Sequence, residues 1–379
     1  MNSWPSDRIR IHEINSSIEE NLNSAVKHAP IFIDGNDALA TFIEDEGLSG
    51  DGTKSSPYII ENLFIEASTA HGIEIRSTDA YLIIQNCKVE GMDGIHLFNA
   101  TNVNVSNNTA NNNNLGIWLG LSSKNTLSGN NVSNNSIYGI YLSTSSNNTL
   151  SKNTAYNNSL GIFLGLSSNN TLSRNTANNN SRGIYLYYSS NNNTLSRNTA
   201  NYNEYGIQLS SSNNYNTLIK NTVNKNDFGI WLSSSSNNTL SGNTASYNKY
   251  GIYLEHSSNK NTIYFNDIYG NTNGQAFEKD DCIDNHWDNG TTGNYWGDDY
   301  ISNYPSAAND GTIWNIPYEI SGNGSGIDHF PLVNSITTGY TIDDSTDTTT
   351  IHTTDDTPGF SFMIAIFFSL FLLIRRKNK

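Results

Sequence analysis

Residues 148–169 read NTLSKNTAYNNSLGIFLGLSSN, and close variants of this unit recur through the middle of the chain. The Gly-Ile pair within the unit occurs nine times, and its glycines are 22 or 23 residues apart. A fixed period of this length is the sequence signature of a solenoid, in which each repeat is stabilised by its neighbours. The nine glycines are Gly72, Gly94, Gly116, Gly139, Gly161, Gly183, Gly206, Gly229 and Gly251.

Each unit contains three short strand-like segments separated by polar turns. In the phrase Gly-Ile-x-Leu the Ile and Leu side chains face one side and residue x faces the other. No segment is long enough to fold alone, so each must pair with the same segment in neighbouring units, and parallel crossovers are almost always right-handed. We therefore predict an all-β, single-stranded right-handed parallel β-helix of about nine core coils, each of about 22 residues and three short strands.

Asparagine dominates the composition: the chain has 62, and 43 of them lie between Thr101 and Gly270. Asn disfavours helix interiors because its side chain competes for backbone hydrogen bonds, so this stretch is not a helical bundle. Asn also tolerates left-handed backbone at turns, and Asn side chains stacked in register hydrogen-bond one another. We predict an interior ladder formed by Asn153, Asn175, Asn198, Asn221 and Asn243.

The variable residue x is aromatic in six of seven consecutive units. If Ile and Leu face the core, these rings form an outward strip about 30 Å long. A strip of rings bordered by Asn, Ser and Thr predicts carbohydrate binding, with sugar faces against the rings and hydroxyl groups bonded to amides. Two alternatives stay open: the rings pack on one another along the strands, or a partner chain covers them. In order, the seven residues are Trp118, Tyr141, Phe163, Tyr185, Gln208, Trp231 and Tyr253.

The charged residues offer only weak candidates for catalysis or ligand binding. Glycoside hydrolysis uses two carboxylates, and the repeats place one pair on successive coils, Glu204 and Asp227, with Lys249 in the same slot one coil later. We favour a solvated row of charges over an acid–base site. A basic row either contacts anionic glycans or forms a solvated edge. Its members are Lys152, Arg174, Arg197 and Lys220.

Composition also limits the partners and cofactors. The formal net charge of −15 disfavours nucleic acid. Cys87 and Cys282 lie in different coils, so we expect neither a disulfide nor a zinc site. The eight histidines are scattered along the sequence and methionines are few, whereas copper sites use groups of His, Met or Cys. We expect no metal ion and no cofactor.

Residues 1–51 form an acidic N-terminal segment and cap. Ser17 to Glu20 has the form of a capping box, which predicts a short helix through about Lys27. We expect a strand at Ile31–Ile33 to cover the first coil, because an open coil end exposes unpaired strand and core. The first thirty residues contain no apolar segment of a signal peptide.

The C-terminal end predicts a location outside the cell. Residues 334–357 form a Thr- and Asp-rich stalk. The last segment, 358–379, contains an apolar run of 15 residues over 360–374 and then a basic cluster, which places the final residues in the cytoplasm. Since an exported domain needs a signal, we expect the true start to lie upstream; the alternative is a cytosolic protein with a hydrophobic tail. Asn-x-Ser/Thr sequons, for example at Asn192 and Asn323, mildly support a glycosylated surface.

The sequence resembles the pectin-lyase-like repeats of NosD-type proteins of archaeal cell surfaces. The resemblance covers roughly Ala29 to Val333, in which we place the β-helix at 52–333 with a closing segment at 282–333. Its most specific motif is the phrase 285–300, NHWDNGTTGNYWGDDY. It implies a right-handed β-helix, and related enzymes imply clustered carboxylates or a calcium site. Here the segment 307–315 has a single carboxylate, which disfavours calcium. The tail is similar to PGF-type sorting signals, which implies a membrane-anchored product, with Pro358, Gly359 and Phe360 as the motif.

These patterns predict a surface-anchored β-helix protein without enzymatic activity, which binds a polysaccharide or cell-surface glycan or has a structural, adhesive role. The first alternative is a polysaccharide-active hydrolase or lyase of pectin-lyase-like fold. The second, implied only by the resemblance, is an accessory factor for metal-cofactor assembly. The oligomeric state is not defined by the sequence.

Overall fold

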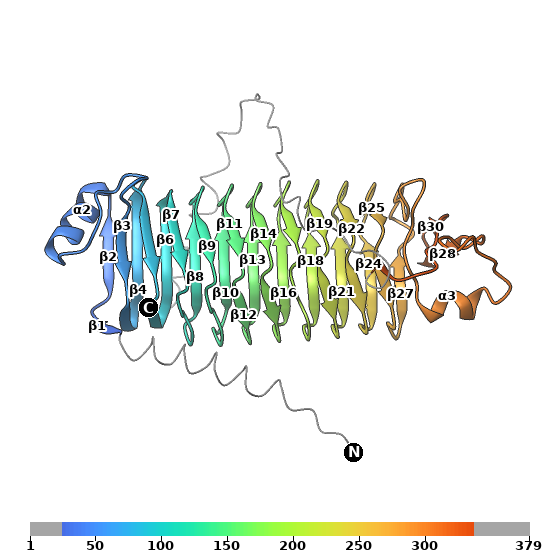
Figure 1. The fold of residues 1–379 in the computed structure, drawn as a ribbon, viewed down its shortest axis with the longest axis horizontal. Helices are drawn as coiled ribbons and strands as arrows, with labels where there is room; N and C mark the ends of the chain where they lie inside the picture. Colours follow the sequence, from blue (N-terminus) through green and yellow to red (C-terminus); the bar gives the residue numbers. More distant parts are fainter. Residues whose placement is uncertain (1–24, 337–379) are drawn as a thin grey trace, which may run out of the picture. The chain divides into compact units, whose positions relative to one another are not determined.

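Short strands at equivalent positions of successive repeats pair side by side and in parallel, because their registers repeat from coil to coil. The structure, a computed structural model that describes residues 25–336, is an all-β parallel solenoid of about ten turns. It has little helix and matches a right-handed β-helix, as the spacing of the Gly-Ile pairs predicts. Figure 1 shows the strands of successive coils aligned along the solenoid.

One side of the solenoid is a sheet of 13 strands, here called the large sheet. From β8 onward its strands carry the Gly-Ile-x-Leu phrase and are six residues long until β24. Its strands are β1 (Val26–His28), β2 (Ile31–Asp34), β4 (Leu63–Thr78), β6 (Lys88–Ala100), β8 (Leu115–Gly120), β10 (Tyr138–Ser143), β13 (Leu160–Gly165), β16 (Arg182–Tyr187), β18 (Tyr205–Ser210), β21 (Phe228–Ser233), β24 (Tyr250–Glu255), β27 (Gly274–Glu278) and β29 (Ser321–Gly322).

The other two sides use the Asn-Thr-Leu and Asn-Thr-Ala phrases. The second sheet has 10 strands: β3 (Tyr58–Glu61), β5 (Leu82–Gln85), β7 (Val103–Ser106), β9 (Thr126–Ser128), β11 (Thr149–Ser151), β14 (Thr171–Ser173), β17 (Thr194–Ser196), β19 (Thr217–Ile219), β22 (Thr239–Ser241) and β25 (Thr262–Tyr264). The third side is made of short pieces: β12 (Thr154–Tyr156), β15 (Thr176–Asn178), β20 (Thr222–Asn224), β23 (Thr244–Ser246) and β26 (Asp267–Tyr269).

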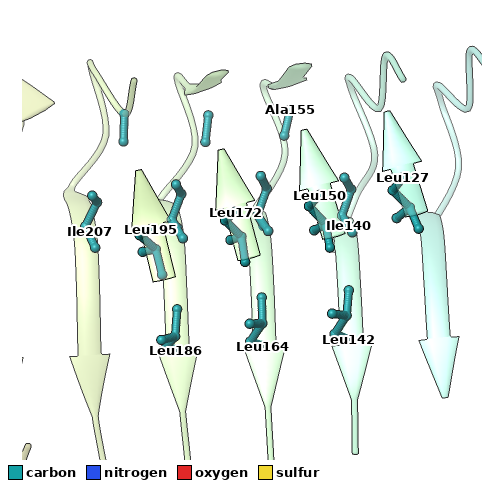
Figure 2. Packing of buried hydrophobic residues seen from close by; sticks show 14 of the residues in the cluster. Leu127, Ile140, Leu142, Leu150, Ala155, Leu164, Leu172, Leu186, Leu195 and Ile207 are labelled. Carbon is teal, nitrogen blue, oxygen red and sulfur yellow. The ribbon is translucent and has the colours of Figure 1, made fainter. Parts of the chain in front are cut away.

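The interior is a column of aliphatic side chains. Each coil contributes Ile and Leu from the large sheet, Leu from the second sheet and a small residue from the third side. Figure 2 shows this for Ile140, Leu142, Leu150 and Ala155, all of which are fully buried. The alternation Ile-x-Leu is therefore explained by the core, which leaves x outside.

Three ladders of buried Asn side chains hold the corners of the coils. Asn153 illustrates the bonding: its backbone N and its side-chain Nδ2 both donate to Oδ1 of Asn175, over 3.0 and 2.9 Å, and Nδ2 also donates to the carbonyl of Leu127. The predicted members lie in the first ladder, Asn108, Asn130, Asn153, Asn175, Asn198, Asn221, Asn243, Asn266 and Asn294.

Two further ladders were not predicted, although their residues recur in the sequence just as regularly. The second ladder lies directly before the Thr-Leu pairs and continues before Thr262-Ile263 and His286-Trp287. Its members are Asn125, Asn148, Asn170, Asn193, Asn216, Asn238, Asn261 and Asn285. The third lies three or four residues before the glycines of the Gly-Ile pairs from Gly116 onward, and ends before Gly274. Its members are Asn113, Asn135, Asn158, Asn180, Asn203, Asn226, Asn248 and Asn271.

The third ladder explains the glycine of the Gly-Ile pair. A Cβ atom at Gly161 would lie 2.5 Å from the carbonyl oxygen of Gly183 and 2.8 Å from Nδ2 of Asn180. These distances are too short for any side chain, so the close approach of backbone and ladder requires glycine.

The solenoid is closed at both ends. Helix α2 (Asn36–Asp45) covers the first coil and buries Leu39 and Ile43. The predicted strand near residue 31 is confirmed as β2, which pairs with β4. The predicted helix through about Lys27 is wrong at its end, because Val26–His28 is strand β1 and gains edge hydrogen bonds to β4.

The C-terminal end closes with helix α3 (Asp298–Asn303) and the hairpin of β28 (Tyr318–Glu319) and β30 (Ile327–Asp328). Trp287 and Trp296 are fully buried there. Their indole nitrogens donate to carboxylates, Trp287 to Glu278 over 2.7 Å and Trp296 to Asp328 over 2.9 Å.

Several predictions fall outside the described residues. These are the capping box at 17–20, the stalk beyond residue 336, and the tail 358–379 with its motif Pro358, Gly359 and Phe360. Within residues 25–336 no helix is both long enough and apolar enough to cross a membrane.

Candidate functional site

The outer face of the large sheet carries residue x of each Gly-Ile-x-Leu phrase. Parallel pairing aligns these residues, for example Tyr141 between Trp118 and Phe163. The alignment continues into β6 and β4, where the same position holds His96 and Glu74. We call the whole set the outer row: Glu74, His96, Trp118, Tyr141, Phe163, Tyr185, Gln208, Trp231 and Tyr253.

A second line of side chains lies beside the outer row, at the residue before each glycine. Its aromatic members pack on the outer row; the ring centroids of Tyr138 and Phe163 are 5.3 Å apart, and those of Tyr205 and Trp231 are 4.7 Å apart. We call this line the flanking row: His71, Asp93, Leu115, Tyr138, Leu160, Arg182, Tyr205, Phe228 and Tyr250.

Three consecutive rings of the outer row, those of Trp118, Tyr141 and Phe163, stack on one another along the solenoid. Trp118 and Tyr141 are nearly parallel, at 8°, with centroids 6.1 Å apart, and Tyr141 and Phe163 follow at 5.2 Å. Near-parallel planes turn the ring faces toward each other, so the row presents mainly ring edges and phenol hydroxyls to solvent. Phe163 is only 8% exposed. The expectation of open, flat ring faces is therefore wrong for the stacked rings, although the row lies outside the core.

Arg182 and Gln208 join the two aromatic groups of this face. Nε of Arg182 donates to Oε1 of Gln208 over 2.6 Å. The guanidinium carbon lies 5.2 Å from the ring centroids of both Tyr185 and Tyr205. At the one position of the predicted seven where x is not aromatic, Gln208 therefore holds the guanidinium of Arg182 over the faces of two rings, a favourable cation–π arrangement.

At the β4–β6 end of both rows the rings give way to ionisable side chains. Nδ1 of His71 lies 3.0 Å from Oδ2 of Asp93, and Nε2 of His71 lies 3.9 Å from Oε2 of Glu74. Nδ1 of His96 lies 3.1 Å from Oε1 of Glu74. We call His71, Glu74, Asp93 and His96 the His–carboxylate cluster.

Arg76 holds one side of this cluster. Its Nη2 atom lies 2.6 Å from Oε1 of Glu74. Its guanidinium carbon lies 5.4 Å from the ring centroid of Phe32 and 5.9 Å from that of Phe98. The arginine is therefore fixed on one oxygen of Glu74, while the other oxygen faces His71.

The two histidines of the cluster have opposite electrostatic environments. The Asp93 carboxylate, whose Oδ2 lies 3.0 Å from Nδ1, raises the pKa of His71. Burial, followed by the charge of His71, lowers the pKa of His96 to about 4. The imidazole of His96 also stacks on the indole of Trp118 with centroids 4.0 Å apart. His96 is therefore a neutral, oriented imidazole at neutral pH.

Sequence reasoning missed this cluster, although its signal was present. The phrases Gly72-Ile-Glu-Ile and Gly94-Ile-His-Leu have Glu74 and His96 at position x. Following x through all nine Gly-Ile pairs, rather than from Trp118 onward, aligns a carboxylate and an imidazole with the aromatic residues.

The predicted charge pair of Glu204 and Asp227 lies elsewhere, at an exposed corner. Glu204 accepts a hydrogen bond from the Ser181 hydroxyl over 3.1 Å. Asp227 forms an ion pair with Lys249 at 2.8 Å, and both side chains are about half exposed, at 43% and 57%. This arrangement is that of a solvated charge row.

The predicted basic row occupies left-handed turn positions directly before members of the first Asn ladder. The φ angles of these four residues are 55–56°. The row thus follows one outer corner of the solenoid, separate from the outer face of the large sheet. Its residues are Lys152, Arg174, Arg197 and Lys220.

The two cysteines are both free and buried. Burial raises the pKa of each thiol to about 11, which keeps both protonated and unreactive. Cys87 donates from its backbone N to Oδ1 of Asn108, so it occupies the first position of the first Asn ladder.

Two family models match the chain. One, described as "Periplasmic copper-binding protein (NosD)", matches residues 156–300, and the other, described as "Right handed beta helix region", matches residues 46–200. Each match covers less than half of the chain, and both agree with the right-handed β-helix fold. No curated protein matches the chain.

The copper in that family description does not fit the matched stretch. Within the described part of the chain, three His, Cys, Asp or Glu ligand atoms come within 4.8 Å of one another only in the group of His71, Glu74 and His96. This group lies outside residues 156–300. We therefore derive no copper chemistry from the match.

Solved structures share the fold at low identity. The A-module of mannuronan C-5 epimerase AlgE6 of Azotobacter vinelandii has a TM-score of 0.50 and 16% identity, over 62% of this chain and 79% of that chain. The AlgE4 A-module of the same organism has a TM-score of 0.50 and 16% identity, over 67% and 87%. The Dettilon tailspike protein has a TM-score of 0.51 and 17% identity, over 75% and 62%.

Proposed function

We propose that this protein is an extracellular polysaccharide-binding protein whose binding surface is the outer face of the large sheet. The observation that carries the proposal is the outer row. Ile and Leu on the inner face stay the same from coil to coil, whereas the outer position holds aromatic, amide and imidazole side chains in one line. A linear polymer fits a linear set of equivalent positions.

The spacing suits an extended sugar chain. Coils of a parallel β-helix repeat about every 4.8 Å, which is close to the length of one sugar unit in an extended polysaccharide. Each coil can then offer one sugar the same contacts: ring edges against C–H groups, and phenol hydroxyls for hydrogen bonds. The indole nitrogens of Trp118 and Trp231 have no hydrogen-bond partner among the described residues and could donate to sugar hydroxyls after a small ring movement.

The comparisons support the same class of ligand and the same location. Two of the similar structures are named as epimerases of mannuronan, a polysaccharide, and one matching family is described as periplasmic. Anchoring through the tail 358–379 is part of the proposal.

A second candidate is a polysaccharide-active enzyme, and the His–carboxylate cluster favours it. The cluster continues the outer and flanking rows, so a chain bound along the rings would reach His71, Glu74 and His96. Two carboxylates and two imidazoles at one end of a glycan-binding face are the residue types that acid–base chemistry on sugars requires.

The test is a glycan array with the full chain, followed by affinity measurement on each bound glycan. We expect the double variant Trp118→Ala plus Trp231→Ala to lower affinity at least tenfold. Tyr156→Ala is the matched control, because Tyr156 is an exposed ring on the third side, at 46%. Equal affinity of the double variant and the wild type for every bound glycan would refute the assigned surface.

The same bound glycans decide between the two candidates. Product formation that is lost in Glu74→Gln, with binding retained, would establish the enzyme. Binding without product would leave the protein as a binding module.

A further inference from the structure

Three side chains with metal-ligating atoms meet at the β4–β6 end of the outer row. One ring nitrogen of His71, one of His96 and one carboxylate oxygen of Glu74 all lie within 4.8 Å of one another. We infer that His71, Glu74 and His96 form a binding site for one divalent first-row transition-metal ion such as Zn²⁺ or Co²⁺.

The ligand set determines the class of ion. Two imidazoles and one carboxylate, with a fourth position left open, form a typical coordination set for zinc. Calcium and magnesium prefer several oxygen ligands, which this group does not offer. Two ligands on one zinc ion, each about 2.1 Å from it, are at most about 4.2 Å apart. Small side-chain rotations are therefore enough to close the site.

Asp93 supplies the outer support that metal-bound histidines use. Nδ1 of His71 lies 3.0 Å from Oδ2 of Asp93, which leaves Nε2 directed toward Glu74, 3.9 Å from Oε2. A carboxylate on the far nitrogen fixes both the tautomer and the ring orientation of a metal-ligating histidine. Asp93 is therefore a positioning residue and not a ligand.

His96 supplies the second, independent observation. It is 3% exposed, and its Nε2 atom is buried without a hydrogen-bond partner among the described residues. A buried, unpaired imidazole nitrogen is unfavourable. An ion bound to Nε2 would give this nitrogen the partner that the described residues do not supply, while Nδ1 stays 3.1 Å from Oε1 of Glu74.

The charges around the site also suit a cation. Glu74 and Asp93 face the two histidines, and within residues 25–336 Arg76 is the one Lys or Arg that forms an ion pair with this group. Arg76 lies 2.6 Å from Oε1 of Glu74, so Oε2 stays available on the side of His71. The two carboxylates outnumber the guanidinium by one negative charge.

The experiment uses the metal-free full chain and titrates it with Co²⁺ and, separately, with Zn²⁺. We expect one ion per chain, visible absorption bands of tetrahedral Co²⁺, their loss when Zn²⁺ displaces Co²⁺, and a higher Tm with Zn²⁺. His71→Ala and His96→Ala should each weaken Zn²⁺ binding more than 30-fold. Asp93→Asn should weaken it about tenfold and keep the Co²⁺ bands.

The matched control is His329→Ala, because His329 is an exposed histidine whose Nδ1 lies 2.9 Å from Oδ2 of Asp288, and the described residues place no third ligand atom near this pair. This variant should bind Zn²⁺ like the wild type. Where an alanine variant fails to fold, Glu74→Gln replaces it in the test. This variant keeps the size of the side chain and should also weaken Zn²⁺ binding. Absence of stoichiometric Zn²⁺ and Co²⁺ binding to the wild type, or equal binding by folded His71→Ala and His96→Ala, would overturn the inference.

The inference is independent of the proposed glycan binding. Glycan affinity of the metal-free protein is measured in the same preparation. Glycan binding without metal binding would overturn only the metal site, and metal binding without glycan binding would overturn only the proposed function.

Discussion

The first two coils of the large sheet and the repeat coils that follow them share an interior and differ at their corners and on their outer face. In both regions the inward residues, such as Ile95 and Ile162, are buried aliphatics. The repeat coils turn each corner with a ladder Asn. In the first coils, β4 and β6 are continuous strands of 16 and 13 residues that pass through one of these corners, whereas later coils divide the same stretch into two strands, such as β12 and β13. Their outer positions hold ionisable groups where the later coils hold rings.

This difference separates the demands of folding from those of function. Inward positions and ladder positions accept few residue types, because a coil must match the coils on both sides of it. The outer position contacts only its neighbours in the row and solvent, so it can vary. Glu74 and His96 occupy the same register position as Trp118 and Tyr141, yet they carry different chemistry.

The largest expected effect comes from breaking a ladder in the repeat coils. Asn193→Ala removes the acceptor of two donors on Asn170 and the donor to the carbonyl of Ser167, which leaves buried polar groups unpaired. We expect a loss of about 4 kcal/mol in the free energy of unfolding, measured by urea denaturation. Asn192→Gly is the control in the same turn, because Asn192 is an exposed residue with φ of 55° that glycine also adopts; an equal loss in both variants would contradict the role of the ladder.

The next largest effect is the difference in stability loss between an inward and an outward residue of one strand, β16. Leu186→Ala opens a cavity in the interior and should cost about 3 kcal/mol. Tyr185→Ala removes ring packing and a hydrogen bond to Ser210, and should cost about 1.5 kcal/mol. Thermal melts of both variants measure the difference, and a larger cost at Tyr185 would show that the outer row is mainly structural.

A pH-dependent effect is expected at the C-terminal end, where a carboxylate replaces the ladder amide. Burial raises the pKa of Asp328 from an ordinary 3.8 to about 7, against the opposing hydrogen bonds from Asn294 and Trp296. The folded state therefore binds this proton more tightly than the unfolded chain does. Its contribution to stability is full below about pH 4 and is lost as the pH rises through about 7.

Between pH 5 and pH 8 this group should lower the free energy of unfolding by about 2 kcal/mol, followed by tryptophan fluorescence in urea. Asp328→Asn should flatten the pH dependence. Asp310→Asn should not, because hydrogen bonds from the turn lower the pKa of that exposed carboxyl to about 2, outside the pH range. An unchanged slope in Asp328→Asn would reject this assignment.

The smallest effect comes from extending a ladder into the first coils. Cys87 already bonds to Asn108 through its backbone N, and its Sγ atom lies 4.0 Å from the carbonyl oxygen of Ile60. In Cys87→Asn the new amide can donate to that carbonyl, as ladder members do. We expect a gain of about 1 kcal/mol in the free energy of unfolding, measured in urea with Cys87→Ala as the control. A loss of stability would mean that the ladder geometry ends before this coil.

The inward positions of the coils could be predicted from the sequence more completely than the outward positions. The fold follows from the Gly-Ile spacing, because inward positions obey a strict period, and the outward direction of Trp118 follows from alternation. Ring packing was one of the alternatives that the sequence left open, because the orientation of a side chain on a free face depends on its neighbours. The His–carboxylate cluster was missed because position x was followed only from Trp118 onward, although Glu74 and His96 hold the same position of the two preceding Gly-Ile phrases.

The Asn ladders have a direction, and this has an electrostatic consequence for the solenoid. In every step the N–H groups of one residue point to the amide oxygen of the next residue toward the C-terminal end, as from Asn153 to Asn175. The amide dipoles therefore add along the axis, as peptide dipoles add in a helix. The positive pole of the first ladder lies at Asn294, whose N–H meets the carboxylate of Asp328 over 2.7 Å. The closing segment thus ends this column of dipoles on a buried acceptor, the side-chain oxygen of Asp328, so the last N–H group of the ladder is not left unpaired.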